Sequence, residues 1–170
     1  MAGAPRTASD NAHISAGSNL GDRAATLRAA MRALAAIPGV RVAAVSALYE
    51  TDPVGGVPQP PYLNLAARLE ITPAMALTPE TLLDEMQRIE RVFGRRRENE
   101  IRWGPRALDL DLLLFGDETR ATDFLTLPHP RMWERAFVLI PLREVAADAP
   151  LRAKLKNFPA SAPTVRVFSG

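Results

Sequence analysis

The sequence predicts an α+β sandwich in which a mainly antiparallel sheet carries helices on one or both faces. Strand-like and helical segments alternate in small numbers, and two neighbouring pairs of strands can form hairpins. The chain has 170 residues, of which 47% are apolar and 24% are charged, so its size and composition are those of one globular domain. We expect a loose polar tail over residues 1–11 and a single domain over residues 12–170.

Four segments have strand-like patterns. Residues 12–16 run into a glycine-containing turn, and residues 40–49 alternate small and β-branched apolar side chains. Residues 62–71 and 107–115 are rich in apolar residues and are bounded by turn-forming ones. We expect these four segments to form the sheet.

Two segments carry helix start and stop signals. Asp22 can cap the first helix, and Thr78 can cap the second, with Pro79 in its first turn. Gly94 ends the second helix. The apolar faces are Leu27, Met31, Leu34 and Ile37 in the first helix and Leu82, Met86, Ile89 and Phe93 in the second.

The remaining segments are loops and one further helix. Residues 51–61 hold four prolines and two glycines, so they can neither continue a helix nor pair inside a sheet. Residues 95–105 form a second, very basic loop. We expect residues 131–147 to form the last helix, interrupted by Pro141, whereas the Pro- and Ala-rich segment past Pro150 has no clear pattern.

Composition excludes several classes of protein. Without cysteine there is no disulfide scaffold, zinc–thiolate site or cysteine nucleophile, and His13 and His129 are too few for a multi-histidine metal centre. No apolar run reaches the ~18–20 residues that cross a bilayer. The N-terminus has no apolar signal core, so we expect a cytoplasmic protein. The net charge of +2 does not by itself indicate a nucleic-acid binder.

Arginines gather in one segment. Between Arg88 and Arg106 there are seven arginines and three glutamates, a local net charge of +4. The planar guanidinium suits carboxylate or phosphate oxygens, so this segment is a candidate for binding an anion. The alternative is a solvated basic loop. Of these arginines, Arg95, Arg97, Arg102 and Arg106 lie in or beside the loop before the last predicted strand.

Asp109 and Asp111 form the second candidate feature. Residues i and i+2 of a strand share a face, so these carboxylates stand side by side while Leu108, Leu110 and Leu112 face the core. Two such carboxylates repel each other unless a cation lies between them. Mg²⁺ is typically held by one or two carboxylates together with substrate phosphates, which fits a pair beside an arginine loop. The alternative is an amphipathic strand with a solvated face, although aspartate is depleted in strands.

Other polar and aromatic residues fit a small-molecule site less specifically. Trp103 in the basic loop can stack on a flat ring or anchor the core, and Tyr62 and Asn64 share one strand face. His129, between two prolines, can donate to a phosphate or be structural. Arg135 can reach the same phosphates, and it shares a face of the predicted last helix with Arg131 at a spacing of i, i+4.

The glycine turn over residues 17–21 matches neither a P-loop nor a dinucleotide fingerprint. The segment Arg102-Trp-Gly-Pro-Arg-Ala-Leu-Asp-Leu-Asp111, however, resembles the signature of the 6-hydroxymethyl-7,8-dihydropterin pyrophosphokinases of folate biosynthesis. The resemblance covers residues 12–147. Six further segments support it and occur in the same order as in the family: Gly17-Ser-Asn-Leu-Gly21, Tyr49-Glu-Thr-Asp-Pro-Val-Gly55, Tyr62-Leu-Asn64, Gln87-Arg-Ile-Glu90, Leu125-Thr-Leu-Pro-His129 and Arg135-Ala-Phe137.

The resemblance implies a ferredoxin-like α+β fold and transfer of the pyrophosphoryl group of ATP to the pterin hydroxymethyl oxygen, releasing AMP. It implies two Mg²⁺ ions held by Asp109 and Asp111, and catalytic roles for Arg97 and Arg106. The implied pterin residues are Thr51, Val54, Tyr62, Asn64, Trp103 and Phe137. The implied ATP residues are Leu83, Gln87, Glu90, Arg97, Arg106, Leu112, Thr126, His129 and Arg135.

Two alternatives remain open at this point. An α+β domain with an arginine loop and a tryptophan could bind RNA, although two carboxylates beside that loop would repel phosphates without a metal. A non-catalytic scaffold could bind the pterin without consuming ATP. We expect a monomer that acts on ATP and the pterin and binds neither nucleic acid nor membrane.

Overall fold

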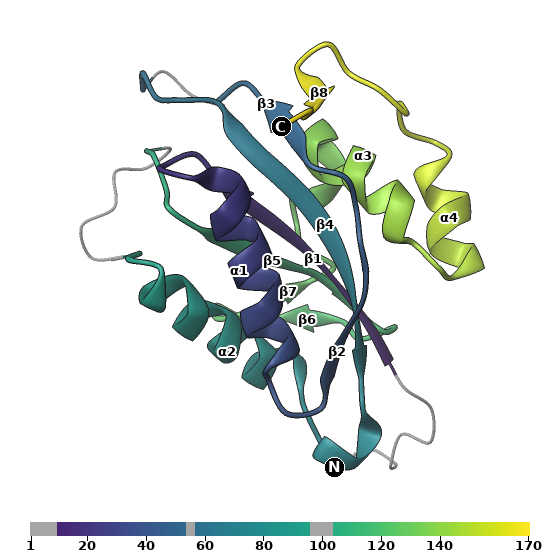
Figure 1. The fold of residues 1–170 in the computed structure, drawn as a ribbon. Coiled ribbons are helices and arrows are strands. Elements are labelled where there is room, and N and C mark those ends of the chain that lie inside the picture. The colour runs from purple at the N-terminus through teal and green to yellow at the C-terminus, as the bar shows by residue number, and fades with distance from the viewer. Residues whose placement is uncertain (1–9, 54–56, 96–103) are drawn as a thin grey trace.

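The computed structural model describes residues 10–53, 57–95 and 104–170. Its centre is an antiparallel sheet with strand order β5-β1-β4-β3-β8, and β2 pairs with β4 next to β3 (Figure 1). The α+β fold with a mainly antiparallel sheet is thus confirmed. The strands of this sheet are β1 (Asp10–Ser18), β2 (Val40–Val45), β3 (Tyr49–Thr51), β4 (Tyr62–Ile71), β5 (Asp109–Phe115) and β8 (Val165–Val167).

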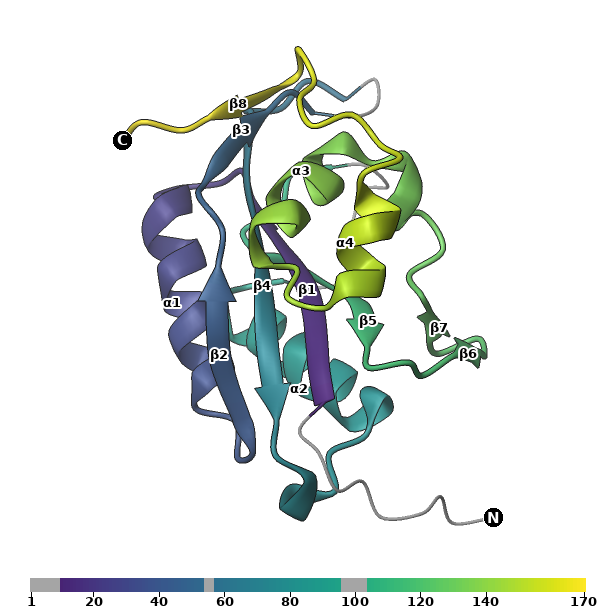
Figure 2. The same ribbon diagram turned by 90° about the vertical axis from the view of Figure 1, so that its right-hand side faces the viewer.

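Helices cover both faces of the sheet. Two long helices lie on one face and two shorter ones on the other (Figure 2). A small separate hairpin of β6 (Arg120–Ala121) and β7 (Thr126–Leu127) follows β5. The helices are α1 (Arg23–Ala35), α2 (Pro79–Val92), α3 (Ala136–Val145) and α4 (Ala149–Leu155), with single 3₁₀ turns η1 (Pro73–Met75) and η3 (Met132–Glu134).

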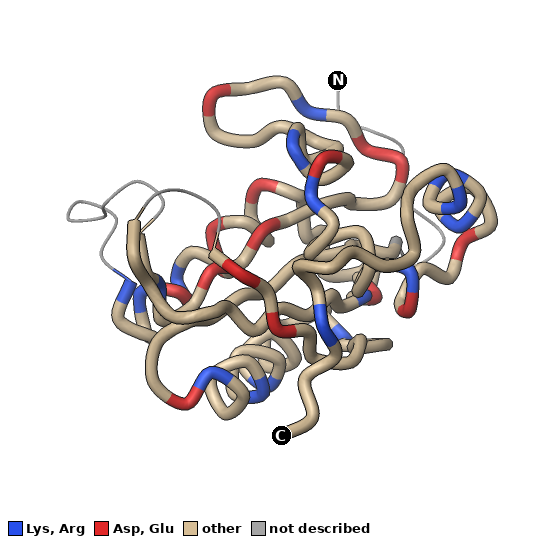
Figure 3. The backbone as a smooth tube through the Cα atoms, turned by 90° about the horizontal axis from the view of Figure 1, so that it is seen from above, with Lys and Arg blue, Asp and Glu red and all other residues tan. Residues whose placement is uncertain are grey.

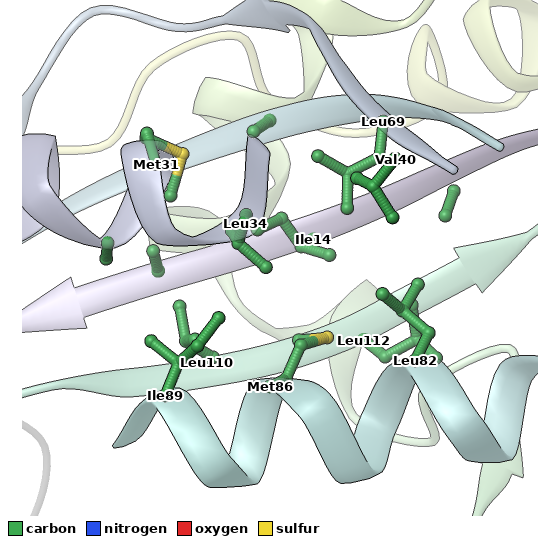
Figure 4. Close-up of a cluster of buried hydrophobic side chains, with 14 of the residues drawn as sticks. Ile14, Met31, Leu34, Val40, Leu69, Leu82, Met86, Ile89, Leu110 and Leu112 are labelled. Atoms are coloured by element: carbon green, nitrogen blue, oxygen red, sulfur yellow. The ribbon is translucent and has the colours of Figure 1, made fainter. Parts of the chain in front are cut away.

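The main core lies between the sheet and the helices α1 and α2. Leu110 of β5 lies beside Ile89 of α2, and Leu112 lies beside Leu82 and Met86 (Figure 4); all five side chains are almost fully buried. Burying a side chain of this size stabilises the fold by about 1.5–3 kcal/mol. A second cluster on the opposite face joins Leu113 of β5 to α3 and α4. Strand β5 is therefore held from both sides.

The helix boundaries follow the capping signals. The Asp22 side chain accepts a hydrogen bond from the Ala25 amide at 2.9 Å, and Thr78 and Thr81 form a reciprocal capping box. Gly94 follows α2 with a φ of 91°, a conformation that glycine adopts without strain. The predicted start of α1 and both ends of α2 are confirmed.

The single strand predicted over residues 40–49 is wrong, because two strands occupy this region. The ladder of β2 with β4 shifts register between Val42 and Ala44, and β2 ends at Val45. Beyond it, the Ser46 amide donates to the Ala66 carbonyl at 2.9 Å, and the Ser46 hydroxyl accepts from the Ala66 amide at 3.0 Å. The hydroxyl replaces a ladder partner there, and pairing with β4 resumes only in β3.

The last helix predicted over residues 131–147 is also wrong. Arg135 has an extended conformation (φ −109°, ψ 102°) that separates η3 from α3, so Arg131 and Arg135 do not share a helix face. Pro141 lies inside α3. The segment past residue 147, which has no clear sequence pattern, folds into α4 and β8. Within the described residues, no helix combines the length and apolar character that a bilayer crossing needs.

His13 is a buried polar group on β1. It is only 2% exposed, and its Nε2 atom has no hydrogen-bond partner among the described residues. Burial lowers its pKa to about 4, with Asp148 opposing the shift and Arg68 adding to it. The imidazole is therefore neutral in the folded protein at neutral pH, which fits a structural role.

We expect stability to fall as the pH drops from about 6.5 toward 4, because only the unfolded chain binds a proton at His13 in this window. Between about pH 7 and about pH 5, proton binding by His13 in the unfolded chain lowers the free energy of unfolding by about 2 kcal/mol. Urea unfolding at both pH values should show this extra loss in the wild type and not in His13→Leu. Equal losses in both proteins would contradict the prediction.

Candidate active site

The candidate site lies on the sheet face opposite α1 and α2, where four strands meet. In the strand register Asp109 of β5 lies opposite Gly17 of β1, which lies opposite Asn64 of β4. Asp111 and Ser15 lie opposite each other in the next row on this face. The leucines that alternate with the two aspartates are buried on the other face, as the period of two predicts.

A first cavity of about 730 Å³ opens above this part of the sheet. Both aspartates line it. The Asn64 amide, which is 4% exposed, donates to the Thr51 hydroxyl at 2.7 Å. Val54 and Trp103, which the sequence also predicts at the pterin site, lie outside the described residues. Four predicted pterin residues line the cavity: Thr51, Tyr62, Asn64 and Phe137.

A second cavity of about 290 Å³ lies on the other side of Asp111. Its floor is β5, one wall is α2, and the other is the loop between β6 and β7 with the segment that follows it. Asp111 lines both cavities, so this residue lies where they meet. Five predicted ATP residues line the second cavity: Leu83, Gln87, Leu112, Thr126 and His129.

Arginine side chains contact both carboxylates. Arg106 donates to Asp109 Oδ2 at 2.9 Å, and Arg95 donates to Asp109 Oδ1 at 2.6 Å. Arg135 donates to Asp111 Oδ2 at 3.4 Å. Arg106 and Arg135 also line the first cavity. The predicted catalytic residue Arg97 lies outside the described residues.

The titration behaviour of the site follows from burial and charge. Burial, followed by the charge of Asp109, raises the pKa of Asp111 above its usual range, and nearby arginines oppose the shift. The Nε2 atom of His129 lies 3.9 Å from Asp111 Oδ1. Burial and the charge of Arg135 lower the pKa of His129. The imidazole is therefore neutral at neutral pH and can donate one ring N–H.

Glu90 lies apart from the other predicted ATP residues. It is 1% exposed and lines neither cavity. Its Oε1 atom accepts hydrogen bonds from the Leu110 amide at 2.7 Å and from Arg95 at 2.5 Å. Glu90 therefore fixes the backbone of β5 beside Asp109 and orients Arg95 toward that carboxylate.

Asn19 is a polar residue of the site that the sequence interpretation did not single out. It is 1% exposed, and its Oδ1 accepts from the Arg106 amide at 2.8 Å. Its Nδ2 donates to Gln59 Oε1 at 2.9 Å and to the Pro60 carbonyl at 3.0 Å. It thus joins the turn after β1 to the proline-rich loop and to Arg106. The only sequence signal was its place in the glycine turn.

Gly17 is a second residue whose role was missed. A Cβ atom at Gly17 would lie 2.9 Å from Asn64 Oδ1 and 3.6 Å from Tyr62 Cδ1. Any side chain here would displace the amide or fill the floor of the first cavity. Glycine leaves this part of the floor flat, between Asp109 on one side and Asn64 on the other.

Comparison with known proteins assigns the chain to a family. The family model described as 7,8-dihydro-6-hydroxymethylpterin-pyrophosphokinase (HPPK) matches residues 13–147. The chain belongs to the HPPK family. The match includes every residue predicted for the site and ends before α4 and β8.

Relatives from bacteria and plants support this assignment. The 2-amino-4-hydroxy-6-hydroxymethyldihydropteridine pyrophosphokinase of Bacillus subtilis is 48% identical over 134 residues, which are 79% of this chain and 77% of the relative. The protein of the same name from Methylorubrum extorquens is 45% identical over 81% of this chain and 83% of its own. A folate synthesis bifunctional protein of Arabidopsis thaliana is 43% identical over 76% of this chain, but only 25% of its own length is matched.

Solved structures agree in fold. An HPPK-DHPS crystallised in complex with substrates superposes with a TM-score of 0.61 at 12% identity, covering 88% of this chain and 43% of that chain. The wild-type HPPK-DHPS of Plasmodium falciparum with STZ-DHP gives a TM-score of 0.58 at 14% identity, covering 90% of this chain and 42% of that chain. The chain thus spans less than half of these longer proteins. The ferredoxin-like α+β fold predicted from the resemblance is confirmed.

The buried position of Glu90 leads to a stability prediction. Glu90→Ala leaves the Leu110 amide and the 7% exposed Arg95 side chain without this partner. We expect a loss of about 1–3 kcal/mol in the free energy of unfolding, the cost of a buried amide without a partner, because Arg95 keeps its ion pair with Asp109. Denaturant titration measures it.

The matched control is Glu85→Ala on the same helix, because Glu85 pairs with Arg88 at the surface. That substitution should change the free energy of unfolding by less than about 0.5 kcal/mol. Similar small losses in both variants would contradict a structural role for Glu90.

Proposed function

We propose that this protein transfers the pyrophosphoryl group of ATP to the hydroxymethyl oxygen of 6-hydroxymethyl-7,8-dihydropterin, releasing AMP, as a step of folate biosynthesis. Membership of the HPPK family supports the reaction. We place the reaction at Asp111, because the cavity with the predicted pterin residues meets the cavity with most of the predicted ATP residues there. An acceptor in one and a nucleotide in the other would bring their reacting groups to the acidic pair.

The pterin ring occupies the first cavity in this proposal. The amide of Asn64 can hydrogen-bond to the edge of a heterocycle, and its pairing with Thr51 fixes its orientation. Tyr62 and Phe137 supply aromatic surfaces, and the flat floor at Gly17 admits a planar ring. Val54 and Trp103 complete the proposed pterin site.

ATP occupies the second cavity. The side chains of Leu83 and Leu112 form apolar surfaces for the base, and Gln87 and Thr126 offer hydrogen bonds. His129 lies at the Asp111 end of this cavity, where its ring N–H can donate to a phosphate oxygen. The proposed ATP residues further include Arg97, Arg106 and Arg135, and also Glu90, which acts on the site only through Leu110 and Arg95.

The acidic pair fits magnesium bound together with phosphates. Among the residues that the structure places, no group of three or more histidine, cysteine or acidic side chains could hold a metal ion alone. Asp109 and Asp111 supply two carboxylates on one face, which is the protein contribution that Mg²⁺ usually needs when phosphates complete its shell. The proposal therefore includes two Mg²⁺ ions held by Asp109 and Asp111. Held by these two carboxylates, Mg²⁺ would supply positive charge against the phosphates and would lower the pKa of the acceptor hydroxyl.

The arginines neutralise charge and keep the carboxylates in place. Arg106 and Arg135 contact one aspartate each and line the first cavity. Their guanidinium groups can therefore offset the negative charge that spreads over the transferring group. In the proposal Arg97 shares this role. The backbone of Arg106 is fixed by its two hydrogen bonds with Asn19, so its side chain starts from a defined position.

The RNA-binding alternative rests on the basic loop over residues 95–105, most of which lies outside the described residues. Along the part of the chain that the structure places, acidic and basic positions are interspersed on the backbone (Figure 3), which adds no observation in favour of RNA. Monomeric state and cytoplasmic location are parts of the proposal that rest on the sequence alone.

The decisive experiment is an assay for AMP and the pterin diphosphate with purified protein, Mg²⁺, ATP and 6-hydroxymethyl-7,8-dihydropterin. We expect AMP formation only when both substrates and the metal are present. Binding of the pterin without AMP formation would instead support the non-catalytic scaffold, and ADP as the product would contradict pyrophosphoryl transfer.

Asp109→Asn tests the acidic pair. The substitution keeps the size of the side chain and removes the charge that a cation needs, so we expect kcat to fall about 100-fold or more. Pterin binding, measured by the fluorescence of the ring, should remain. The control is Asp117→Asn in the exposed turn after β5, for which kcat should be unchanged. Retention of normal turnover by Asp109→Asn would remove this carboxylate from the mechanism.

A further inference from the structure

The C-terminal strand β8 lies outside the segment that defines the family, yet it belongs to the same sheet as the site. The family match ends at residue 147, whereas β8 spans Val165–Val167. It pairs antiparallel with β3, so that Val165 lies opposite Thr51. On its other side, β3 pairs with β4, and Thr51 lies opposite Tyr62.

These pairings place three side chains in one row. Directly opposed residues of an antiparallel pair share a face of the sheet. Val165, Thr51 and Tyr62 therefore point to the same side, and all three line the first cavity. Thr51 and Tyr62 are proposed pterin residues. Val165 extends their row by one strand, and Thr164 before it also lines the cavity.

Several contacts fix β8 in this position. The Val165 amide donates to the Ala162 carbonyl at 3.0 Å, which closes a turn before the strand. Arg166 donates to Asp52 Oδ1 at 2.8 Å, at the start of the proline-rich loop. After the strand, the Phe168 amide donates to the Leu48 carbonyl at 2.8 Å. The strand is therefore anchored before, within and after the residue that faces the cavity.

A second set of contacts ties the end of β8 to α1. The Arg23 guanidinium lies 5.7 Å from the centre of the Phe168 ring, which makes a cation–π contact. Arg23 also forms an ion pair with Glu50 of β3 at 3.0 Å and donates to the Pro61 carbonyl at 2.8 Å. One side chain thus links the end of β8, strand β3 and the end of the proline-rich loop.

We propose that Val165 is a specificity-determining residue of the pterin site, where it supplies an apolar wall against the heterocycle at the end of the Tyr62–Thr51 row. This proposal rests on the proposed function for the identity of the ring. Val165 contacts the acceptor and not the nucleotide, because it lines only the first cavity. A loss of this wall therefore weakens the pterin and leaves ATP unaffected.

The test replaces Val165 with serine and measures steady-state kinetics for each substrate. We expect KM for the pterin to rise about tenfold, the low end of what lost methyl groups cost in an apolar pocket, with kcat and KM for ATP within about twofold of wild type. Val165→Ile keeps an apolar wall and should restore pterin affinity to within about threefold.

The matched control is Val167→Ser, two residues along the same strand. Val167 is 64% exposed and lines neither cavity, so its substitution should leave all three kinetic parameters unchanged. An equal effect of both serine variants, or a parallel rise of KM for ATP with a lowered melting temperature, would show that β8 is only structural and would overturn the proposal.

Equilibrium binding of the pterin, followed by ring fluorescence, separates this proposal from the reaction itself. If wild-type protein forms no AMP but binds the pterin, and Val165→Ser weakens that binding about tenfold, the result contradicts the proposed function and supports the role of Val165. If wild-type protein forms AMP and Val165→Ser binds the pterin normally, the result contradicts the role of Val165 and supports the proposed function.

Discussion

The repulsion between Asp109 and Asp111 is the constraint on which the site depends. Burial raises the pKa of Asp111 above its usual range, and the charge of Asp109 on the same strand face adds to the shift. Three arginines offset this cost from different directions, and Arg95 is itself oriented by the buried Glu90. The acidic pair persists because the surrounding chain supplies cations, and the same cations suit phosphate oxygens. Stability and the proposed chemistry thus share one set of charges.

Much of this arrangement could be predicted from local sequence. The alternation of leucine and aspartate in β5 has a period of two, which leaves one possible face for each residue type. The side-chain oxygens of Asp22 and Thr78 each accept a hydrogen bond from a backbone amide three residues later, in the first turn of the helix. Both partners are close in sequence, so these caps can be predicted from local sequence alone. The resemblance to the HPPK family then separated the predicted pterin residues from the predicted ATP residues, and those that are described lie mostly in different cavities.

The parts that could not be predicted depend on distant partners. Ser46 divides a continuous β-like pattern because its hydroxyl takes a ladder position opposite Ala66. Strand β8 has three residues, and its extended conformation depends on pairing with β3 more than 100 residues earlier. The role of Glu90 was hidden for the same reason. In the sequence of α2, Glu90 does not differ from the other charged residues of the helix. Only the packing of α2 against β5 brings its carboxylate to the Leu110 amide.

The contact between Glu90 and Leu110 has a consequence for association between molecules. β5 is the outermost strand on its side of the sheet, and an outermost strand offers unpaired amides and carbonyls to any other extended chain. Here the carboxylate of Glu90 takes the Leu110 amide, and the His129 amide donates to the Leu113 carbonyl at 2.9 Å. Foreign strands find these groups already engaged. Two hydrogen-bonding groups on the strand that carries the acidic pair are thereby withdrawn from pairing with another chain.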